Sequence, residues 1–252
     1  MGAKLMETLW HDLRYGWRML RRNPGFAIVA VLTLAIGIGA NAAIFSVINT
    51  ILIQPLPFFQ PNRIAVVFDT DPNRNVPRGM VSAAEFLDWQ DMNHVFKSMS
   101  GFRPSLVTLT GNGEPEQNYG VQVSGNFFRL LGVKPALGRD FLPDEEIPGH
   151  EQVVMLGYPL WQRRYAGDPQ ILGKSILLDY KPYTVIGVLP PKFSLFGMSA
   201  SLDIWLPFAF NRAQLDRNDH GLMAFARLKD GVSIPQAQAE METIIEIGRA
   251  HV

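Results

Sequence analysis

The residues of this 252-residue chain that could do chemistry are a glycine-rich stretch, five histidines and a few acidic clusters. Gly167 to Ser175 comes nearest to a phosphate-binding loop, in which backbone amides cradle phosphate groups. That loop has four residues between its glycines and opens a helix, whereas here five residues separate Gly167 from Gly173. Ile176 to Leu178 also looks extended. The sequence therefore predicts no nucleotide site there.

A second glycine pattern, Gly37 to Ala42, formally fits the dinucleotide-binding fingerprint. That fingerprint requires a preceding strand within a βαβ unit, and this copy lies in the middle of a long apolar run. We interpret the match as coincidental and expect no cofactor.

Metal-ligating residue types are present, but their spacing predicts no metal site. The five histidines are scattered, with no pair at ligand spacing: His11, His94, His150, His220 and His251. Asp216 to Gly221 is faintly similar to a calcium loop, but Arg227 stands where a bidentate glutamate is required. Asp144 to Glu146 is interpreted as a solvated acidic turn. No catalytic residue is expected, although a Ser-His-Asp set assembled only by folding stays open.

The composition excludes further classes of function. The 23 basic and 23 acidic residues balance, so no electrostatic bias toward nucleic acid is expected. The chain has no cysteine, which excludes disulfides, thiolate catalysis and cysteine-ligated zinc.

The longest apolar run, Phe26 to Ile53, contains no charged residue and follows four arginines between Arg14 and Arg22. A helix of roughly 27 residues is about 40 Å long, which exceeds the ~30 Å hydrocarbon layer. Arginines beside a span resist translocation, so the N-terminus is predicted to be cytoplasmic. We expect a transmembrane helix over 25–53 and an extracytoplasmic domain over 54–252, in the inner membrane.

A cleavable signal peptide is the alternative reading of this run, because Ala40-Asn41-Ala42 has the form of a cleavage site. The apolar residues resume at once from Ala43 to Ile53, whereas a cleavage site usually ends the apolar region. An uncleaved span is therefore preferred.

Two sets of residues in this part are predicted to contact lipid or another helix. Leu9, Leu13 and Trp17 recur at helical spacing and predict an amphipathic helix over 1–24 at the cytoplasmic membrane surface. Within the span a stripe of small residues predicts a helix-packing face: Ala35, Gly39, Ala43 and Ser46.

The region after the span mixes strands and helices without regular alternation, which favours an α+β fold. Capping-box spacing predicts helix starts at Ser82 and Ser233, the first helix carrying Phe86, Trp89 and the nearby Phe96 on its apolar face. Ser124 is expected to cap a brief helix that ends at Gly132. The remaining predicted elements are a helix over 158–165 and strands over 63–69, 105–110, 118–123, 153–156, 174–179, 182–188, 203–206 and 222–228, with a hairpin turn at Tyr180-Lys181.

Several motifs, in this order, resemble the N-terminal part of a MacB-type ABC transporter permease, of the subfamily described as acidobacterial duplicated orphan permeases. The resemblance spans nearly the whole chain. It is carried by 12–15, 21–26, 32–41, 45–47, 86–89, 123–128, 131–139, 160–164, 183–188 and 190–191.

The resemblance implies a first transmembrane helix followed by a two-lobed extracytoplasmic core domain. The membrane-proximal lobe would cover about 62–100 and 205–250, and the inserted lobe about 101–204. It also implies a dimer that pairs with a cytoplasmic ABC ATPase subunit and passes ATP-driven movement to the outer domain for export, with no catalytic residue of its own.

Such permeases continue into another membrane span and a coupling loop, so a truncated product or a fragment is expected. Two alternatives stay open at this point. One is a membrane-tethered binding or sensory module without transport activity, and the other is a tethered hydrolase.

Overall fold

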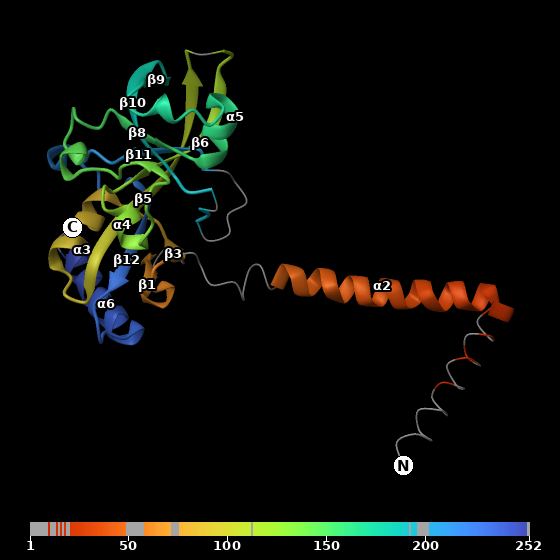
Figure 1. Cartoon of the computed structure of the whole chain (residues 1–252). Helices are drawn as coiled ribbons and strands as arrows, with labels where there is room; N and C mark the ends of the chain where they lie inside the picture. Colours follow the sequence, from red (N-terminus) through yellow and green to blue (C-terminus); the bar gives the residue numbers. More distant parts are fainter. Residues whose placement is uncertain are drawn as a thin grey trace. The chain divides into compact units, whose positions relative to one another are not determined.

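The computed structural model describes residues 10, 14, 16, 18, 21–48, 58–71, 76–111, 113–191, 193–195 and 202–250, some of them by backbone alone. The chain divides into two units, Met1–Pro55 and Leu56–Val252. We call the second unit the sheet domain (Figure 1).

The first unit contains one long helix, α2, which runs from Pro24 to Ile48. Proline suits the first turn of a helix, because its missing N–H has no intrahelical partner there. No charged side chain interrupts α2, so the charge-free run is helical as far as Ile48, and residues 49–53 lie outside the described part of the chain. The predicted surface-helix residues Leu9, Leu13 and Trp17 also lie outside it.

The sheet domain is built on one mixed sheet of ten strands, and its order is β1-β12-β5-β6-β11-β8-β10-β7. The pairs β6–β11 and β8–β10 are parallel and the other neighbours in this order are antiparallel. β4 pairs with β12, and β9 pairs with both β10 and β5. The bounds are β1 Ile64–Val67, β4 Val81–Ser82, β5 Phe96–Thr110, β6 Glu116–Val123, β7 Leu137–Gly138, β8 Val153–Leu156, β9 Ser175–Leu178, β10 Lys181–Val188, β11 Ile204–Pro207 and β12 His220–Leu228.

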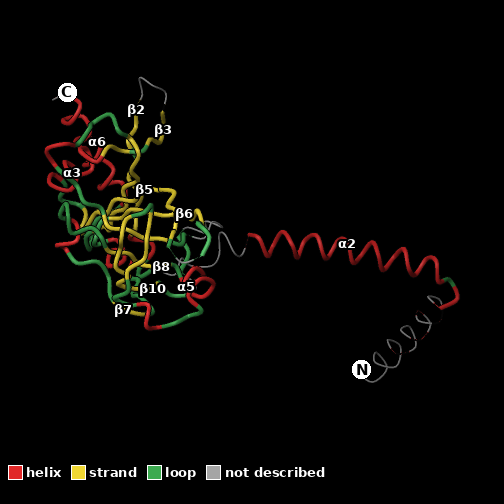
Figure 2. The backbone as a smooth tube through the Cα atoms, turned by 90° about the horizontal axis from the view of Figure 1, so that it is seen from above, coloured by secondary structure: helices red, strands yellow, loops and turns green. Residues whose placement is uncertain are grey.

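The strand β5 joins the two parts of this sheet. Its first half pairs with β12 from Phe96 to Phe102, and its second half pairs with β6 from Phe102 to Leu109. Its last residues also pair with β9, so the pairings β5–β6–β11–β8–β10–β9–β5 form a closed ring. A separate hairpin consists of β2, Asp69–Asp71, and β3, Val76–Gly79, and Figure 2 shows it at the end of the domain that carries α3 and α6.

The helices begin and end where local signals place them. α3, Ala83–Met92, starts with the predicted capping box, in which the Glu85 N–H donates to Ser82 Oγ at 3.2 Å. α6, Ile234–Ala250, starts with the second predicted box, between Ser233 and Gln236. The shorter helices are α4, Phe127–Leu131, and α5, Tyr158–Tyr165. In Figure 1, α3 and α6 lie together at one end of the sheet domain and α5 lies at the other.

Three hydrophobic clusters fill the domain. One lies between α3, α6 and β12, and another lies between α5 and the ring of strands. Between them a cluster of fully buried aromatic rings is centred on Phe102, Phe127, Trp205 and Phe225, with the rings of Phe127 and Phe225 centred 5.5 Å apart. The α+β prediction, with one apolar helix before a sheet-rich domain, is confirmed, while the boundaries of the two lobes stay a prediction.

Three local predictions were wrong in detail. β5 begins at Phe96 rather than Ser105, because Phe96 to Phe102 is largely buried on both faces and lacks the alternating pattern of a half-exposed strand. Phe96 therefore lies in β5, not in α3, although both contribute to one core. The hairpin turns at Asp179-Tyr180, where both residues have positive φ, one residue earlier than predicted.

The predicted cap of α4 was also wrong. The N-cap residue is Asn126. Ser124 Oγ instead accepts a hydrogen bond from the Gly101 N–H at 2.8 Å, inside the domain. The predicted end of this helix at Gly132 is confirmed, with a left-handed φ of 73°.

Gly132 generates a prediction, because a Cβ added there would collide with the Cβ of Phe59. We expect Gly132→Ala to lower the free energy of unfolding by about 3 kcal/mol, of which about 1–2 kcal/mol is backbone strain and the rest is overpacking. The matched control is Gly173→Ala, where φ is 77° but no atom lies within 4 Å of the added Cβ. Denaturant unfolding in detergent, followed by tryptophan fluorescence, measures both variants, and equal losses would contradict the collision.

Candidate functional site

The described residues of α2 form a candidate membrane anchor. Pro24–Ala42 is long and apolar enough to cross a membrane by length and composition, a test that a signal sequence also passes. Its apolar side chains are exposed, with Phe26 at 73% and Ile36 at 71%. A helix that is apolar all round needs lipid or protein around it.

The predicted helix-packing residues lie on α2, as far as they are described. Ala35 and Gly39 are both exposed, and a Cβ added at Gly39 would meet no atom within 4 Å. Ala43 and Ser46 continue the helix by their backbone, but their side chains lie outside the described residues. The stripe as a contact face stays a prediction.

The sheet domain receives the chain through Phe58–Arg63, which we call the leading segment. Phe58 is buried, and its ring centre lies 6.4 Å from that of Phe193. The Phe59 N–H donates to the carbonyl oxygen of Leu131, in the last turn of α4, at 3.0 Å. The first described residues after the anchor are therefore bonded directly to the body of the domain.

Arg227 of β12 holds the leading segment from the other side. Its Nη2 donates to the Phe59 carbonyl oxygen at 2.7 Å, and its Nε donates to the Leu130 carbonyl oxygen at 2.8 Å. The guanidinium also lies 5.6 Å from the centre of the Phe59 ring, within cation–π range. Leu130 O and Leu131 O are end-of-helix carbonyls that α4 cannot satisfy itself, so Arg227 and Phe59 complete the helix.

The Arg227 side chain carries its charge inside the domain. The residue is only 8% exposed, and in the described part of the chain no carboxylate lies within ion-pair distance of it. Burial, and then the positive charge of Arg63, lower the pKa of Arg227, but arginine stays protonated in proteins. Backbone carbonyl dipoles and an aromatic face therefore compensate the buried cation.

Arg63 adds a second connection between the leading segment and β12. Its Nη2 donates to the Leu228 carbonyl oxygen at 2.9 Å, and its Nη1 forms an ion pair with Asp230 just after β12. Immediately after Arg63, β1 pairs with β12 from Ile64 to Val67. The leading segment and β1 are therefore fixed to one strand along their length.

A cavity of about 310 Å³ lies between β1 and α6. Most of its lining is apolar, including Val67 from β1 and Met241 from α6, and its charged members are Arg78 and Glu242. The first strand of the sheet domain and its last helix thus line the same groove.

Two of the stretches that the sequence excluded as sites take part in local structure. Ser175 begins a strand, as predicted for the residues after Gly173, and Lys174 Nζ pairs with Asp168 at 3.2 Å. The acidic turn is solvated only in part: Asp144 is exposed, but Glu145 is only 8% exposed and pairs with Arg139 at 2.5 Å. The hydrogen bond to Glu145 raises the pKa of Arg139.

Sequence reasoning missed Arg227 as a functional candidate. In the sequence, Arg227 is notable only because it replaces the glutamate that a calcium loop requires. An arginine inside an otherwise apolar strand could have indicated this role. Charged residues are rarely buried, so one in a buried strand needs specific partners. Its partners are backbone carbonyls, which no side-chain spacing reveals.

Among curated relatives, the Hahella chejuensis "Macrolide export ATP-binding/permease protein MacB" is 29% identical over 90% of this chain and 34% of its own length. The Escherichia coli protein of the same name is 23% identical over 93% of this chain and 37% of its own length. The chain thus spans about a third of the length of these relatives.

Two solved structures share the fold. The periplasmic region of MacB from Actinobacillus actinomycetemcomitans matches with a TM-score of 0.52 and 17% identity, over 74% of this chain and 81% of that one. A domain of a putative permease protein from Porphyromonas gingivalis matches with a TM-score of 0.54 and 18% identity, over 77% and 87%.

The family described as "MacB-like periplasmic core domain" matches residues 27–244, which include most of α2 and nearly all of the sheet domain. The predicted resemblance is thereby confirmed: this chain belongs to the family of the MacB-like periplasmic core domain.

Proposed function

We propose that this chain is a membrane-anchored component of an ABC-type export permease. In this proposal α2 crosses the inner membrane, the N-terminus is cytoplasmic and the sheet domain is extracytoplasmic. Movement driven by ATP hydrolysis in a cytoplasmic ABC ATPase subunit passes along α2 into the sheet domain and supports substrate export. The names of the relatives support export and an ATP-binding partner.

The observation that carries the proposal is the fixation of the leading segment by Arg227 and Arg63. A displacement that reaches Phe59 and Arg63 would pass to β12 through their hydrogen bonds. β12 pairs directly with β1, β4 and β5. Because packed interiors deform little, a pull on this strand would move the domain as a body.

The proposal also assigns partners. Membrane lipid would surround most of α2, whose apolar side chains need cover. A second copy of the chain, or another permease segment, would pack on the stripe of Ala35, Gly39, Ala43 and Ser46, where small residues allow close approach. The ATPase activity would belong to the separate cytoplasmic subunit, and this chain would not itself be an enzyme.

A second candidate function is a membrane-tethered binding module that captures an apolar ligand without transport. The groove between β1 and α6 favours it, because apolar side chains dominate its lining. The two candidates differ in whether an ATPase accompanies the chain in the membrane.

One prediction tests the orientation of the chain in the membrane. Because the chain has no cysteine, an introduced cysteine is its single thiol. We expect Glu114→Cys, at an exposed position between β5 and β6, to react with a membrane-impermeant maleimide in intact spheroplasts. Lys4→Cys should react only after lysis, because the arginine-flanked end stays inside. Labelling in the opposite order would exclude the proposed topology.

A second prediction tests partners. Affinity purification of the tagged chain from its native membrane in mild detergent should retain an ABC ATPase. Gly39→Leu should reduce both the ATPase recovered and the association of α2 in a membrane two-hybrid assay, because a larger side chain separates the helices. Ile36→Leu, an apolar exchange of similar volume on α2, is the control. Purification without any ATPase would favour the tethered binding module.

A third prediction concerns Arg227. We expect Arg227→Met to lower the free energy of unfolding by about 2–5 kcal/mol, because the carbonyls of Phe59 and Leu130 lose a charged donor. Arg212→Met is the matched control, since Arg212 pairs with Asp91 at 3.1 Å but its side chain is 64% exposed. It should cost less than about 1 kcal/mol. Denaturant unfolding in detergent measures both, and equal losses would show that the leading segment is not held by Arg227.

A further inference from the structure

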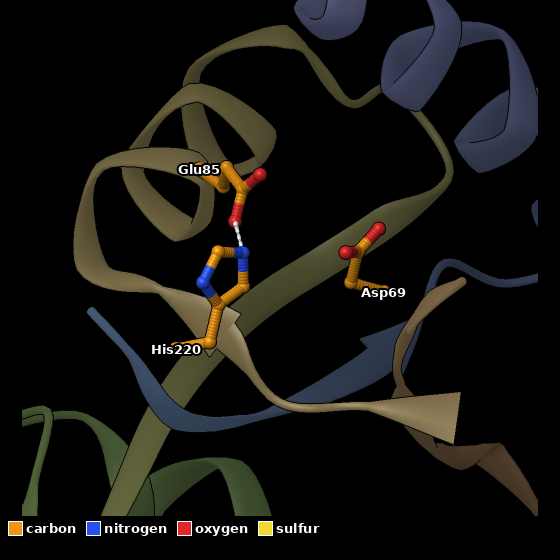
Figure 3. Close-up of side chains that lie close together, drawn as sticks. All are labelled: Asp69, Glu85 and His220. Atoms are coloured by element: carbon orange, nitrogen blue, oxygen red, sulfur yellow. Dashed lines mark ion pairs between the residues drawn. The ribbon is translucent and has the colours of Figure 1, made fainter. Parts of the chain in front are cut away.

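Three ligand-type side chains from distant parts of the sequence converge at one end of the sheet. Asp69 comes from β2, Glu85 from the first turn of α3, and His220 from the first residue of β12. One nitrogen or oxygen atom of each lies within 4.8 Å of the others, and Figure 3 shows the three side chains facing a common space.

Strand pairing brings these residues together. β1 pairs with β12 as far as Val67 and Ala224, and two residues later Asp69 pairs with Gly79 in the β2–β3 hairpin. The chain then returns through β4, where Ser82 lies opposite His220. Because Ser82 is also the N-cap of α3, Glu85 is placed beside His220 by backbone geometry.

The imidazole of His220 presents a defined nitrogen to this space. Its Nδ1 lies 3.0 Å from the carbonyl oxygen of Asn218, which can only accept, so Nδ1 carries the proton. Nε2 then faces Glu85 Oε2 at 3.6 Å. Histidines that bind metals commonly donate their other N–H to a backbone carbonyl in this way.

Hydrogen bonds from Ser82 already fix the Glu85 carboxylate. Its Oε2 accepts hydrogen bonds from the Ser82 N–H at 3.0 Å and from Ser82 Oγ at 2.9 Å. A carboxylate has about four lone-pair sites, two on each oxygen, so this capping occupies those of Oε2 and leaves Oε1 for a metal. The Glu85 and His220 side chains are 29% and 33% exposed, which leaves water access to the site.

We propose that Asp69, Glu85 and His220 bind one divalent transition-metal ion, with Zn²⁺ the best match. One imidazole nitrogen and two carboxylate oxygens suit zinc, with water in a fourth position, whereas Ca²⁺ and Mg²⁺ prefer oxygen ligands alone. Zinc ligands at about 2.0–2.2 Å in a tetrahedron lie about 3.3–3.6 Å from one another, so binding draws the three side chains together. The ion joins the β2–β3 hairpin, α3 and β12, and so stabilises this end of the domain.

The test uses the full chain in detergent, freed of metal with a chelator and titrated with Zn²⁺ by calorimetry. We expect one zinc ion per chain and a higher unfolding temperature with zinc. His220→Gln and Glu85→Gln should each weaken binding at least about tenfold. Glu85→Gln is informative because glutamine preserves the capping box, and it decides alone if His220→Gln does not fold.

The matched control is His94→Gln. His94 Nδ1 lies 3.7 Å from Glu240, so it offers a second histidine–glutamate pair, but it is not part of the three-ligand group. Zinc affinity should be unchanged in this variant. The inference is overturned if Glu85→Gln binds zinc as tightly as the parent, if His94→Gln removes the binding, or if Ca²⁺ binds and Zn²⁺ does not.

Discussion

The buried guanidinium of Arg227 is the interaction on which the organisation of the sheet domain depends. A charge inside a protein is costly unless polar groups compensate it, and here the carbonyls of Phe59 and Leu130 accept hydrogen bonds from Nη2 and Nε. The Leu130 carbonyl also needs a donor, since α4 ends at Leu131 and cannot satisfy its last turn. One side chain therefore completes a helix, secures the leading segment and joins both to β12.

The same region imposes tight steric limits. Gly132 adopts a left-handed conformation at the end of α4, and Phe59 occupies the space that a Cβ at Gly132 would need. The bond from the Phe59 N–H to Leu131 O requires this close approach. The leading segment is thus fixed by hydrogen bonds, by the contact of the Phe59 ring with the Arg227 guanidinium, and by the lack of a side chain at Gly132.

From this junction the sheet forms a continuous hydrogen-bonded path. β12 pairs with the first half of β5, and the second half of β5 belongs to the closed ring of strands. The aromatic cluster around Phe102 lies where the two halves of β5 meet. In the proposed function this path carries movement from α2 into the domain, while the groove and the three-ligand group lie at the end where α3, α6 and the β2–β3 hairpin gather.

Features that depend on neighbouring residues were predictable from the sequence alone. A charge-free run predicted the long apolar helix, and Ser82 with Glu85 predicted the start of α3, because helical periodicity and capping act within one or two turns. Ordered motifs predicted the family. Only the tertiary structure decided the partners of Arg227, the buried pair of Glu145 with Arg139, and the meeting of Asp69, Glu85 and His220. These depend on strand pairing between distant segments and on bonds to backbone carbonyls, and neither leaves a pattern in residue spacing.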